Sequence, residues 1–235
     1  MTLPVVIIRP EPGCSTTAGT ARGLGLKVVC HPLFEVVAVP WAMPEGRLDG
    51  LLIGSANAIR LGGPMIDRLA DKPVYAVGKS TAAAAWERGL RTAGIGAGSL
   101  QHVLDELTGQ QLRLLRIAGA ERVQLVPPEG VEIVSVIAYR VESLPLPDAL
   151  AKILRGGAIV LLHSAAAAGH FAAETGRLGL ARDAIALAAL SSRVAEAAGE
   201  GWAALRVAGE PHDPALLALA REMCHEPFEG RDGRQ

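Results

Sequence analysis

Small hydroxyl and amide side chains follow apolar runs at four places along the chain, and these residues are the best placed to do chemistry. They are Ser55 with Asn57, Thr81, Ser164, and Ser191 with Ser192. Capping of a helix N-terminus is the simpler interpretation of any one of them. The free amides and positive dipole end of a helix N-terminus also bind carboxylates or phosphates. Four such turns on the ligand edges of two related lobes would let a nearly neutral protein hold a polyanion.

Two of these turns lie in stretches that look like copies of each other. Residues 48–58 form an apolar run that breaks into Gly-Ser-Ala-Asn, and residues 156–166 form one that breaks into His-Ser-Ala-Ala. A second apolar run follows each of them, at residues 73–82 and 184–195. A short buried strand that leads into an Ala-rich helix is typical of an open parallel sheet, which binds ligands at the carboxyl ends of its strands. The duplication predicts two similar lobes with ligand edges that can face one another.

The composition narrows the class of protein. The chain has 235 residues, half of them hydrophobic but only 3% aromatic, and its formal net charge is −1. This length suits one large or two small α/β domains, with a core of Ala, Val, Leu and Ile between helices and a parallel sheet. Nucleic-acid binding is disfavoured because base stacking needs aromatic rings and phosphate binding needs a surplus of basic residues.

The three cysteines, Cys14, Cys30 and Cys224, are scattered and odd in number. We therefore expect no disulfide framework and a reducing, cytoplasmic location. The histidines form no ligand pattern with these cysteines, so no zinc site is predicted.

One stretch approaches the length of a membrane span, because no charged residue occurs between Arg155 and Glu174. Its polar residues and its Ala-rich second half favour a strand followed by a helix instead. Arg9 and Glu11 interrupt the first apolar run, so we expect no secretory signal peptide.

Three common catalytic motifs are incomplete. Gly78-Lys79-Ser80-Thr81 looks like a phosphate-binding loop, but the required earlier glycine is replaced by Pro73. No Gly-x-Gly-x-x-Gly follows a strand, and no Gly-x-Ser-x-Gly elbow is present.

Long extended segments suggest how the chain divides. Residues 34–39 and 131–141 both look extended and bracket everything between them, so we expect them to pair. The middle of the chain would then be one lobe inserted into the other. We assign 1–37 and 144–228 to lobe 1, 41–138 to lobe 2, 34–41 and 136–143 to linker strands, and 229–235 to a frayed tail.

An ordered set of short motifs runs along the chain. The set comprises Ile8-Arg9-Pro10, Pro32-Leu33, Trp41, the segment 49–58, Ala76-Val77-Gly78 with Thr81-Ala82, Gly119 with Arg122 and Leu125, Ala138-Tyr139, Ser164-Ala165 with Ala167, and Pro211. This ordered set resembles the uroporphyrinogen-III synthase (HemD) family. Each motif alone is weak, but their order and spacing cover nearly the whole chain.

The resemblance implies an α/β fold of two flavodoxin-like or HemD-like parallel-sheet lobes, joined by a two-stranded β linker, with the active site in the interlobe cleft. It implies a monomeric enzyme of tetrapyrrole and haem biosynthesis that uses no cofactor and no metal. The implied reaction is that of a cyclising lyase acting on hydroxymethylbilane, a linear tetrapyrrole with eight carboxylates. Loss of the terminal hydroxyl gives an azafulvene, and closure through a spiro-pyrrolenine inverts ring D to give uroporphyrinogen III. Transient contact with hydroxymethylbilane synthase is a further expectation.

The resemblance also nominates site residues. Tyr139 matches the cleft tyrosine of the family and would donate a hydrogen bond to the departing hydroxyl; its other interpretation is a strand residue packed at the hinge. The expected substrate-binding residues are Arg9, Ser55, Ala56, Asn57, Gly78, Thr81, Gly119, Ser164, Ala165 and Ser191.

Three positions depart from the family pattern. Gly54 stands where Thr is usual, Val194 stands where a hydroxyl is expected, and His163 fills a turn usually occupied by another residue. These departures favour main-chain amides as the binding groups.

Two other functions remain open from the sequence. A two-lobed small-molecule binding or sensor module would have the same cleft and no reaction. A nucleotide-dependent transferase is weakened by the missing phosphate motifs.

Overall fold

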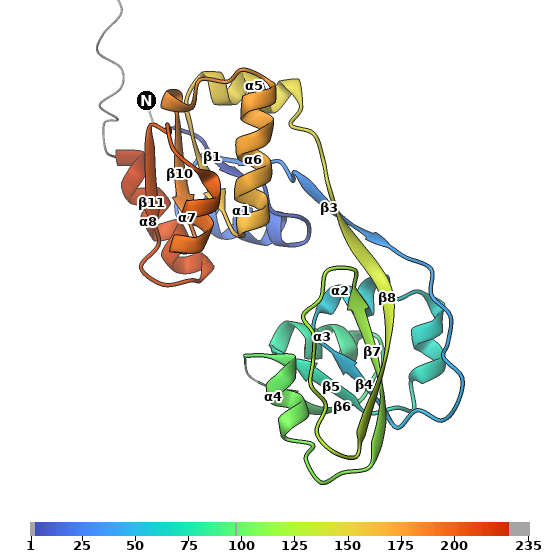
Figure 1. Ribbon diagram of the computed structural model, residues 1–235. Helices are drawn as coiled ribbons and strands as arrows, with labels where there is room; N and C mark the ends of the chain where they lie inside the picture. The colour runs from blue at the N-terminus through green and yellow to red at the C-terminus, as the bar shows by residue number, and fades with distance from the viewer. Residues whose placement is uncertain (1–2, 97, 226–235) are drawn as a thin grey trace, which may run out of the picture. The chain divides into compact units, whose positions relative to one another are not determined.

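The computed structural model describes residues 3–96 and 98–225, which divide into two compact units. Among these residues, unit 1 comprises 3–35 and 143–225, and unit 2 comprises 36–96 and 98–142. Each unit is built on its own largely parallel sheet (Figure 1). The chain is therefore an α/β protein in which unit 2 is inserted into unit 1. The expected tail at 229–235 lies outside the described residues.

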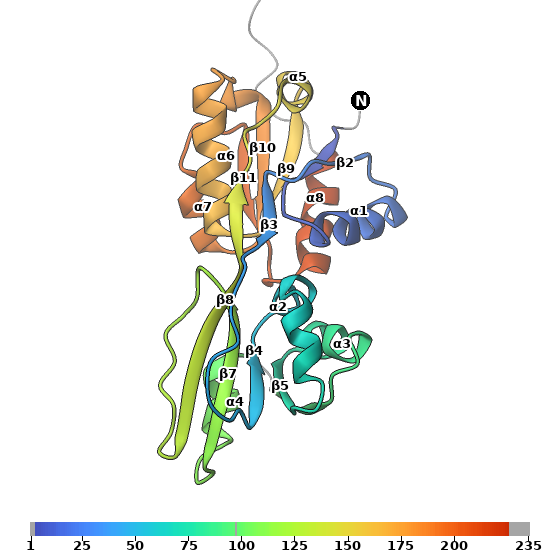
Figure 2. The same ribbon diagram turned by 90° about the vertical axis from the view of Figure 1, so that its right-hand side faces the viewer.

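Unit 1 contains a five-stranded parallel sheet with the order β2-β1-β9-β10-β11. Its strands are β1 (Val5–Ile7), β2 (Val28–Cys30), β9 (Ala158–Leu162), β10 (Ile185–Ala189) and β11 (Ala204–Val207). Its helices are α1 (Gly13–Gly23), α5 (Asp148–Arg155), α6 (Ala165–Arg177), α7 (Ser192–Ala198) and α8 (Asp213–His225), with a 3-10 turn at Arg182–Ala184. Figure 2 shows α6 and α7 on one side of this sheet and α1 and α8 on the other.

Unit 2 contains a six-stranded sheet with the order β3-β8-β7-β4-β5-β6. Its strands are β3 (Phe34–Ala38), β4 (Gly50–Ile53), β5 (Val74–Val77), β6 (Thr92–Gly96), β7 (Leu112–Gly119) and β8 (Val131–Ser143). Its helices are α2 (Ala56–Leu61), α3 (Lys79–Glu87) and α4 (Leu100–Asp105), with a 3-10 turn at Pro64–Leu69. The strands from β8 to β6 pair in parallel.

Strand β3 is the exception, and it pairs with β8 as the sequence predicts. Leu144 N donates to Leu33 O, and Val39 N donates to Ala138 O. Because the partner number falls as the number along β3 rises, the two strands run antiparallel.

Five strands of unit 2 can be matched in order to the five strands of unit 1: β8-β7-β4-β5-β6 corresponds to β2-β1-β9-β10-β11. The order in unit 1 is that of flavodoxin, and unit 2 reaches it with its strands connected in a different sequence. On this correspondence β4 matches β9 and β5 matches β10. The similar sequence stretches 48–58 and 156–166 therefore hold structurally matching strands.

Alternation along each strand places apolar side chains on both faces of each sheet, because successive residues of a strand point to opposite sides. In unit 1, Val160 packs toward α5, α6 and α7, whereas Leu161 packs toward α1 and α8. In unit 2, Leu51 packs toward α2 and α3, whereas Leu52 packs toward α4.

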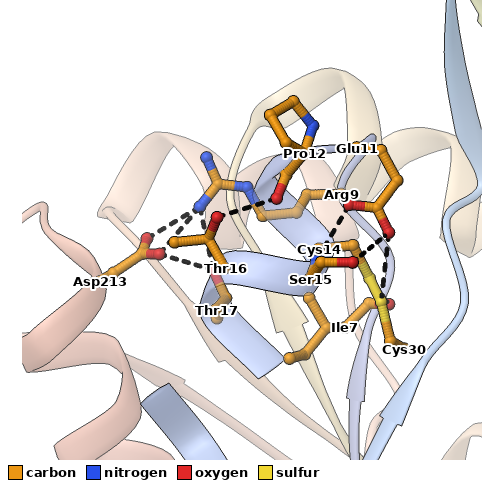
Figure 3. The surroundings of a disulfide bond; sticks show 10 residues. All are labelled: Ile7, Arg9, Glu11, Pro12, Cys14, Ser15, Thr16, Thr17, Cys30 and Asp213. Atoms are coloured by element: carbon orange, nitrogen blue, oxygen red, sulfur yellow. Dashed lines mark hydrogen bonds and ion pairs between the residues drawn. A yellow bond between two sulfur atoms is a disulfide. The ribbon is translucent and has the colours of Figure 1, made fainter. Parts of the chain in front are cut away.

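No disulfide framework was expected, but the structure contains one disulfide. Cys14, in the first turn of α1, is bonded to Cys30, the last residue of β2, with a Cα–Cα distance of 5.9 Å (Figure 3). The sequence argument failed because α1 crosses back beside β2, which brings together cysteines that are 16 residues apart. Cys224 is free.

The disulfide also bears on metal binding. Glu11, Cys14 and Cys30 form the one group of described residues with a spacing suited to a metal ion, but the disulfide removes the thiolates that would ligate it. No helix among the described residues is long and apolar enough to cross a membrane.

Phe171 anchors the core of unit 1, and its truncation should destabilise that unit. The side chain is fully buried, and its ring stacks on Trp202 with centroids 5.6 Å apart. We expect Phe171→Ala to lower the free energy of unfolding of unit 1 by about 3–5 kcal/mol, as measured by urea denaturation. The matched control Val207→Ala, at a side chain that is 40% exposed, should cost less than about 1 kcal/mol. Equal losses would contradict this description of the core.

Candidate functional site

Each sheet has one pair of neighbouring strands after which the chain continues to opposite sides of the sheet. Polar residues gather at the carboxyl ends of both pairs. The pair is β1 and β9 in unit 1 and β7 and β4 in unit 2. Open parallel sheets bind ligands outside the carboxyl ends of the strands at this position, because the two chains leave in opposite directions and open a crevice. Both edges are therefore candidate ligand sites.

In unit 1 this edge is occupied by a closed network of side chains around Asp213, the first residue of α8. Arg9 Nη1 donates to both carboxylate oxygens of Asp213, at 3.0 and 2.9 Å, and Thr17 Oγ1 donates to Oδ2 at 2.6 Å (Figure 3). Arg9 Nη1 also lies 3.2 Å from Thr17 Oγ1. His163, which follows β9, places Nε2 3.4 Å from Asp213 Oδ1. The carboxylate partner of Arg9 is thus supplied by the protein itself.

The network keeps Asp213 ionised. The neighbouring His163 ring, together with the Thr17 hydroxyl and the Arg9 guanidinium, holds the pKa of the Asp213 carboxyl well below its usual range, although partial burial acts in the opposite direction. The His163 side chain is only 8% exposed. This cluster links α1, α8 and the ends of β1 and β9, which are far apart in the sequence.

In unit 2 the corresponding edge is open. A pocket of about 310 Å³ lies at the ends of β4 and β7. Its lining includes Gly54 and Ser55 after β4, Arg116 and Gly119 on β7, and Tyr139 on β8. The sequence predicted Ser55, Gly119 and Tyr139 as site residues, and the fold brings these three together.

Tyr139 lies against Gly119 because the two residues pair across β7 and β8, just after a register shift between Ala118 and Gly119. A Cβ at position 119 would meet Tyr139 Cε2 at 2.7 Å and Cζ at 2.8 Å. Glycine is therefore the residue that lets the ring sit here. The Tyr139 side chain is partly exposed, and its hydroxyl has no hydrogen-bond partner within residues 3–96 and 98–225.

Arg116 is the residue that the sequence reasoning missed. It lies inside β7, is 8% exposed, and lines both this pocket and a neighbouring one of about 490 Å³. Burial and the nearby Arg122 lower the pKa of Arg116, and the proximity of Tyr139 acts in the opposite direction. The available signal was a charged residue within the otherwise apolar run from Leu114 to Ala118.

The remaining predicted residues mostly start helices. Ser55 caps α2, where its hydroxyl accepts from Asn57 N at 3.2 Å, and Ser164 caps α6, where its hydroxyl accepts from Ala167 N at 3.1 Å. Ser191 precedes α7 without a side-chain cap. The helix-capping interpretation thus holds for Ser55 and Ser164.

Five further predicted residues lie at or near helix starts without lining the unit 2 pocket. Ala56 and Asn57 begin α2, and Ala165 begins α6. Gly78 precedes α3 with a φ of +77°. Thr81 is 2% exposed inside α3, so its hydroxyl is turned away from solvent.

A family model described as uroporphyrinogen-III synthase HemD matches residues 15–218, which is most of the chain. The chain belongs to the uroporphyrinogen-III synthase family. Among curated proteins no sequence match is found.

One solved structure of the family has a similar fold. A uroporphyrinogen-III synthetase from Helicobacter pylori 26695 aligns with a TM-score of 0.63 and 15% identity over 95% of this chain and 100% of its own. A mutant uroporphyrinogen III synthase from the extremely thermophilic bacterium Thermus thermophilus aligns with a TM-score of 0.49 and 18% identity over 95% and 100%. At this identity the Helicobacter likeness supports the two-lobed family fold alone.

In this family member, the Asp213 network gives a defined pH dependence. A carboxyl whose pKa is lowered on folding stabilises the folded state above its unfolded pKa of about 4, and this stabilisation fades as the pH falls below that value. We therefore expect Asp213→Asn to lower the melting temperature at pH 7 and to lower it by less at pH 3, where the stabilisation has begun to fade.

Thermal unfolding of wild type and variant at both pH values checks this expectation. The control Asp183→Asn, at an exposed residue of the same unit, should have little effect at either pH. An Asp213→Asn loss of the same size at pH 7 and pH 3 would show that the charge of Asp213 contributes nothing.

Proposed function

We propose that this chain is a uroporphyrinogen-III synthase, a lyase that converts hydroxymethylbilane into uroporphyrinogen III with loss of water. Membership of the family carries the proposal, since the family model matches residues 15–218. The open pocket of unit 2 supports it, because it places a partly exposed tyrosine hydroxyl at the edge where parallel sheets bind ligands.

In the proposed reaction the terminal hydroxyl leaves first, and the Tyr139 hydroxyl donates a hydrogen bond to it as it departs. The electron pair of the pyrrole nitrogen expels the hydroxyl, which takes up a proton and leaves as water, and the nitrogen loses its own proton, so that a neutral azafulvene remains. Attack by the substituted carbon of ring D forms a spiro-pyrrolenine. That intermediate fragments and recloses with ring D inverted.

The main contribution of the protein in this scheme is positional. The substrate can close by itself to the wrong isomer, so the enzyme has to hold one geometry through ring closure. We propose that Ser55, Gly119 and Tyr139 contribute to this positioning from the unit 2 pocket. Arg9 is the weakest of the sequence-nominated binding residues, because Asp213 already occupies its guanidinium.

We further propose that the protein acts as a cytoplasmic monomer and receives its substrate from hydroxymethylbilane synthase. The family membership and the instability of the substrate support these points. The cysteine argument for a reducing compartment no longer supports the location, because Cys14 and Cys30 are bonded.

An isomer assay tests the proposed function. Freshly prepared hydroxymethylbilane is incubated with the protein, the products are oxidised, and the type I and type III isomers are separated by chromatography. We expect type III only when the protein is present. Type I alone, at the uncatalysed rate, would indicate a binding module with this fold and no reaction.

Tyr139→Phe should lower the rate of type III formation substantially, because it removes the hydroxyl and keeps the ring against Gly119. The exposed residue Ser192 lines neither described pocket, so Ser192→Ala should retain full activity. Equal, near-full activity of both variants would remove Tyr139 from the mechanism.

Gly119→Ala should impair turnover through Tyr139. The added Cβ would lie less than 3 Å from two ring atoms of Tyr139, so the ring has to move. The matched control Gly94→Ala is also in a strand of unit 2, and its Cβ would meet only Tyr75 Cδ1, at 3.8 Å. We expect a lower kcat for Gly119→Ala alone. An unchanged kcat would mean that the position of the ring does not matter.

A further inference from the structure

The guanidinium of Arg116 is a buried positive charge without a counter-charge. Within residues 3–96 and 98–225, no hydrogen bond or ion pair joins its side chain to another residue. Glu121 lines the same pocket but forms no ion pair with Arg116, and Arg122 adds a second positive charge nearby. Burying a charge is costly unless it is paired, and arginine remains protonated even when its pKa is lowered.

Unit 1 also has an arginine at this edge, but that arginine is paired. β1 corresponds to β7, and the pairing registers place Ile7 opposite Leu161 as Arg116 lies opposite Leu52. Arg9 therefore lies two residues beyond the position that matches Arg116. Arg9 is neutralised by Asp213 at the start of α8. Helix α4 corresponds to α8, because each follows the last strand of its sheet on the same face. Yet α4 begins with Leu100, which packs against Gly54 and carries no charge.

A second difference leaves the Arg116 face open. In unit 1, helix α1 connects β1 to β2 and covers the sheet, and it contributes Thr17 to the network. In unit 2 the corresponding connection, residues 120–130, contains no helix and borders the two pockets. Arg116 is thus nine-tenths buried but reachable from both pockets.

We propose that Arg116 binds a carboxylate of the linear tetrapyrrole, so that a substrate side chain neutralises Arg116 as Asp213 neutralises Arg9 in unit 1. The assignment rests on the proposed function. The planar fork of a guanidinium can make two parallel hydrogen bonds to one carboxylate, which fixes orientation as well as charge. Because Arg116 and Tyr139 line one pocket, this contact would set the substrate relative to the tyrosine hydroxyl.

The test compares Arg116→Gln, Arg116→Lys and the control Arg91→Gln, which removes an exposed arginine beside the amino end of β6. The assay yields kcat and KM for hydroxymethylbilane. Arg116→Gln should raise KM by about 10- to 100-fold, the effect of losing a hydrogen bond to a charged group. The KM of Arg116→Lys should lie between those of Arg116→Gln and wild type, because lysine keeps the positive charge but cannot make two parallel hydrogen bonds to one carboxylate. The KM of Arg91→Gln should match that of wild type.

Thermal unfolding separates binding from a structural role. Without ligand, Arg116→Gln should melt at the same temperature as wild type or higher, because an unpaired buried charge is gone. Uroporphyrinogen III, kept reduced, should raise the melting temperature of wild type and Arg91→Gln but not of Arg116→Gln. A variant that melts well below wild type while keeping its KM and its product-induced shift would make Arg116 a structural residue and overturn the assignment.

The same experiments distinguish the two levels of the proposal. If wild type forms type III and Arg116→Gln keeps both KM and the shift, only the assignment of Arg116 fails. If wild type neither forms type III nor is stabilised by uroporphyrinogen III, the proposed function and the assignment fail together.

Discussion

Both polar edges depend on one constraint. In each sheet two parallel strands pair side by side, and the chain leaves them toward opposite sides of the sheet. In unit 1, β1 pairs with β9, and the strands that follow them, β2 and β10, lie on opposite sides of this pair. In unit 2, β7 pairs with β4, and β8 and β5 lie on opposite sides in the same way. Side chains that follow these strands must therefore converge at one edge. This places Arg9 beside His163 in unit 1, and Gly119 beside Gly54 and Ser55 in unit 2.

The two units differ in what occupies this edge of the sheet. Unit 1 closes it with a carboxylate, a hydroxyl and a guanidinium that satisfy one another, and this network ties α1 and α8 to the sheet. Unit 2 has Leu100 at the start of the corresponding helix and no helix between β7 and β8, so Arg116 has no partner among the described residues and the edge stays open. The polar edge of unit 1 thus contributes to stability, whereas the edge of unit 2 is available for a ligand. Folded proteins commonly carry such locally unfavourable features where function requires them.

Sequence reasoning identified most of the fold because the decisive signals are local. The short apolar runs and the turns at Ser55 and Ser164 predict strand–helix units directly, and the similarity of 48–58 to 156–166 reflects the matching strands β4 and β9. The two long extended segments led us to predict that one lobe is inserted into the other. The placement of Tyr139 beside Gly119 could be anticipated only through the family resemblance.

The missed features are those that depend on distant contacts. Asp213 reaches Arg9 across 204 positions, and Cys14 meets Cys30 through the packing of α1, so neither partner can be assigned from spacing alone. Nothing in the sequence singled out Arg116, because β7 also contains Arg113, which pairs with Glu132. The significance of Arg116 is its lack of a partner among the described residues, which only a three-dimensional structure can reveal.

The central claim is that the open edge of unit 2 receives a carboxylate of the tetrapyrrole at Arg116. A crystal structure of the protein with uroporphyrinogen III, grown without oxygen, tests this claim most directly. We predict a product carboxylate within hydrogen-bond distance of the Arg116 guanidinium, in the pocket lined by Gly119 and Tyr139. Bound product that leaves Arg116 without a carboxylate partner would contradict the account.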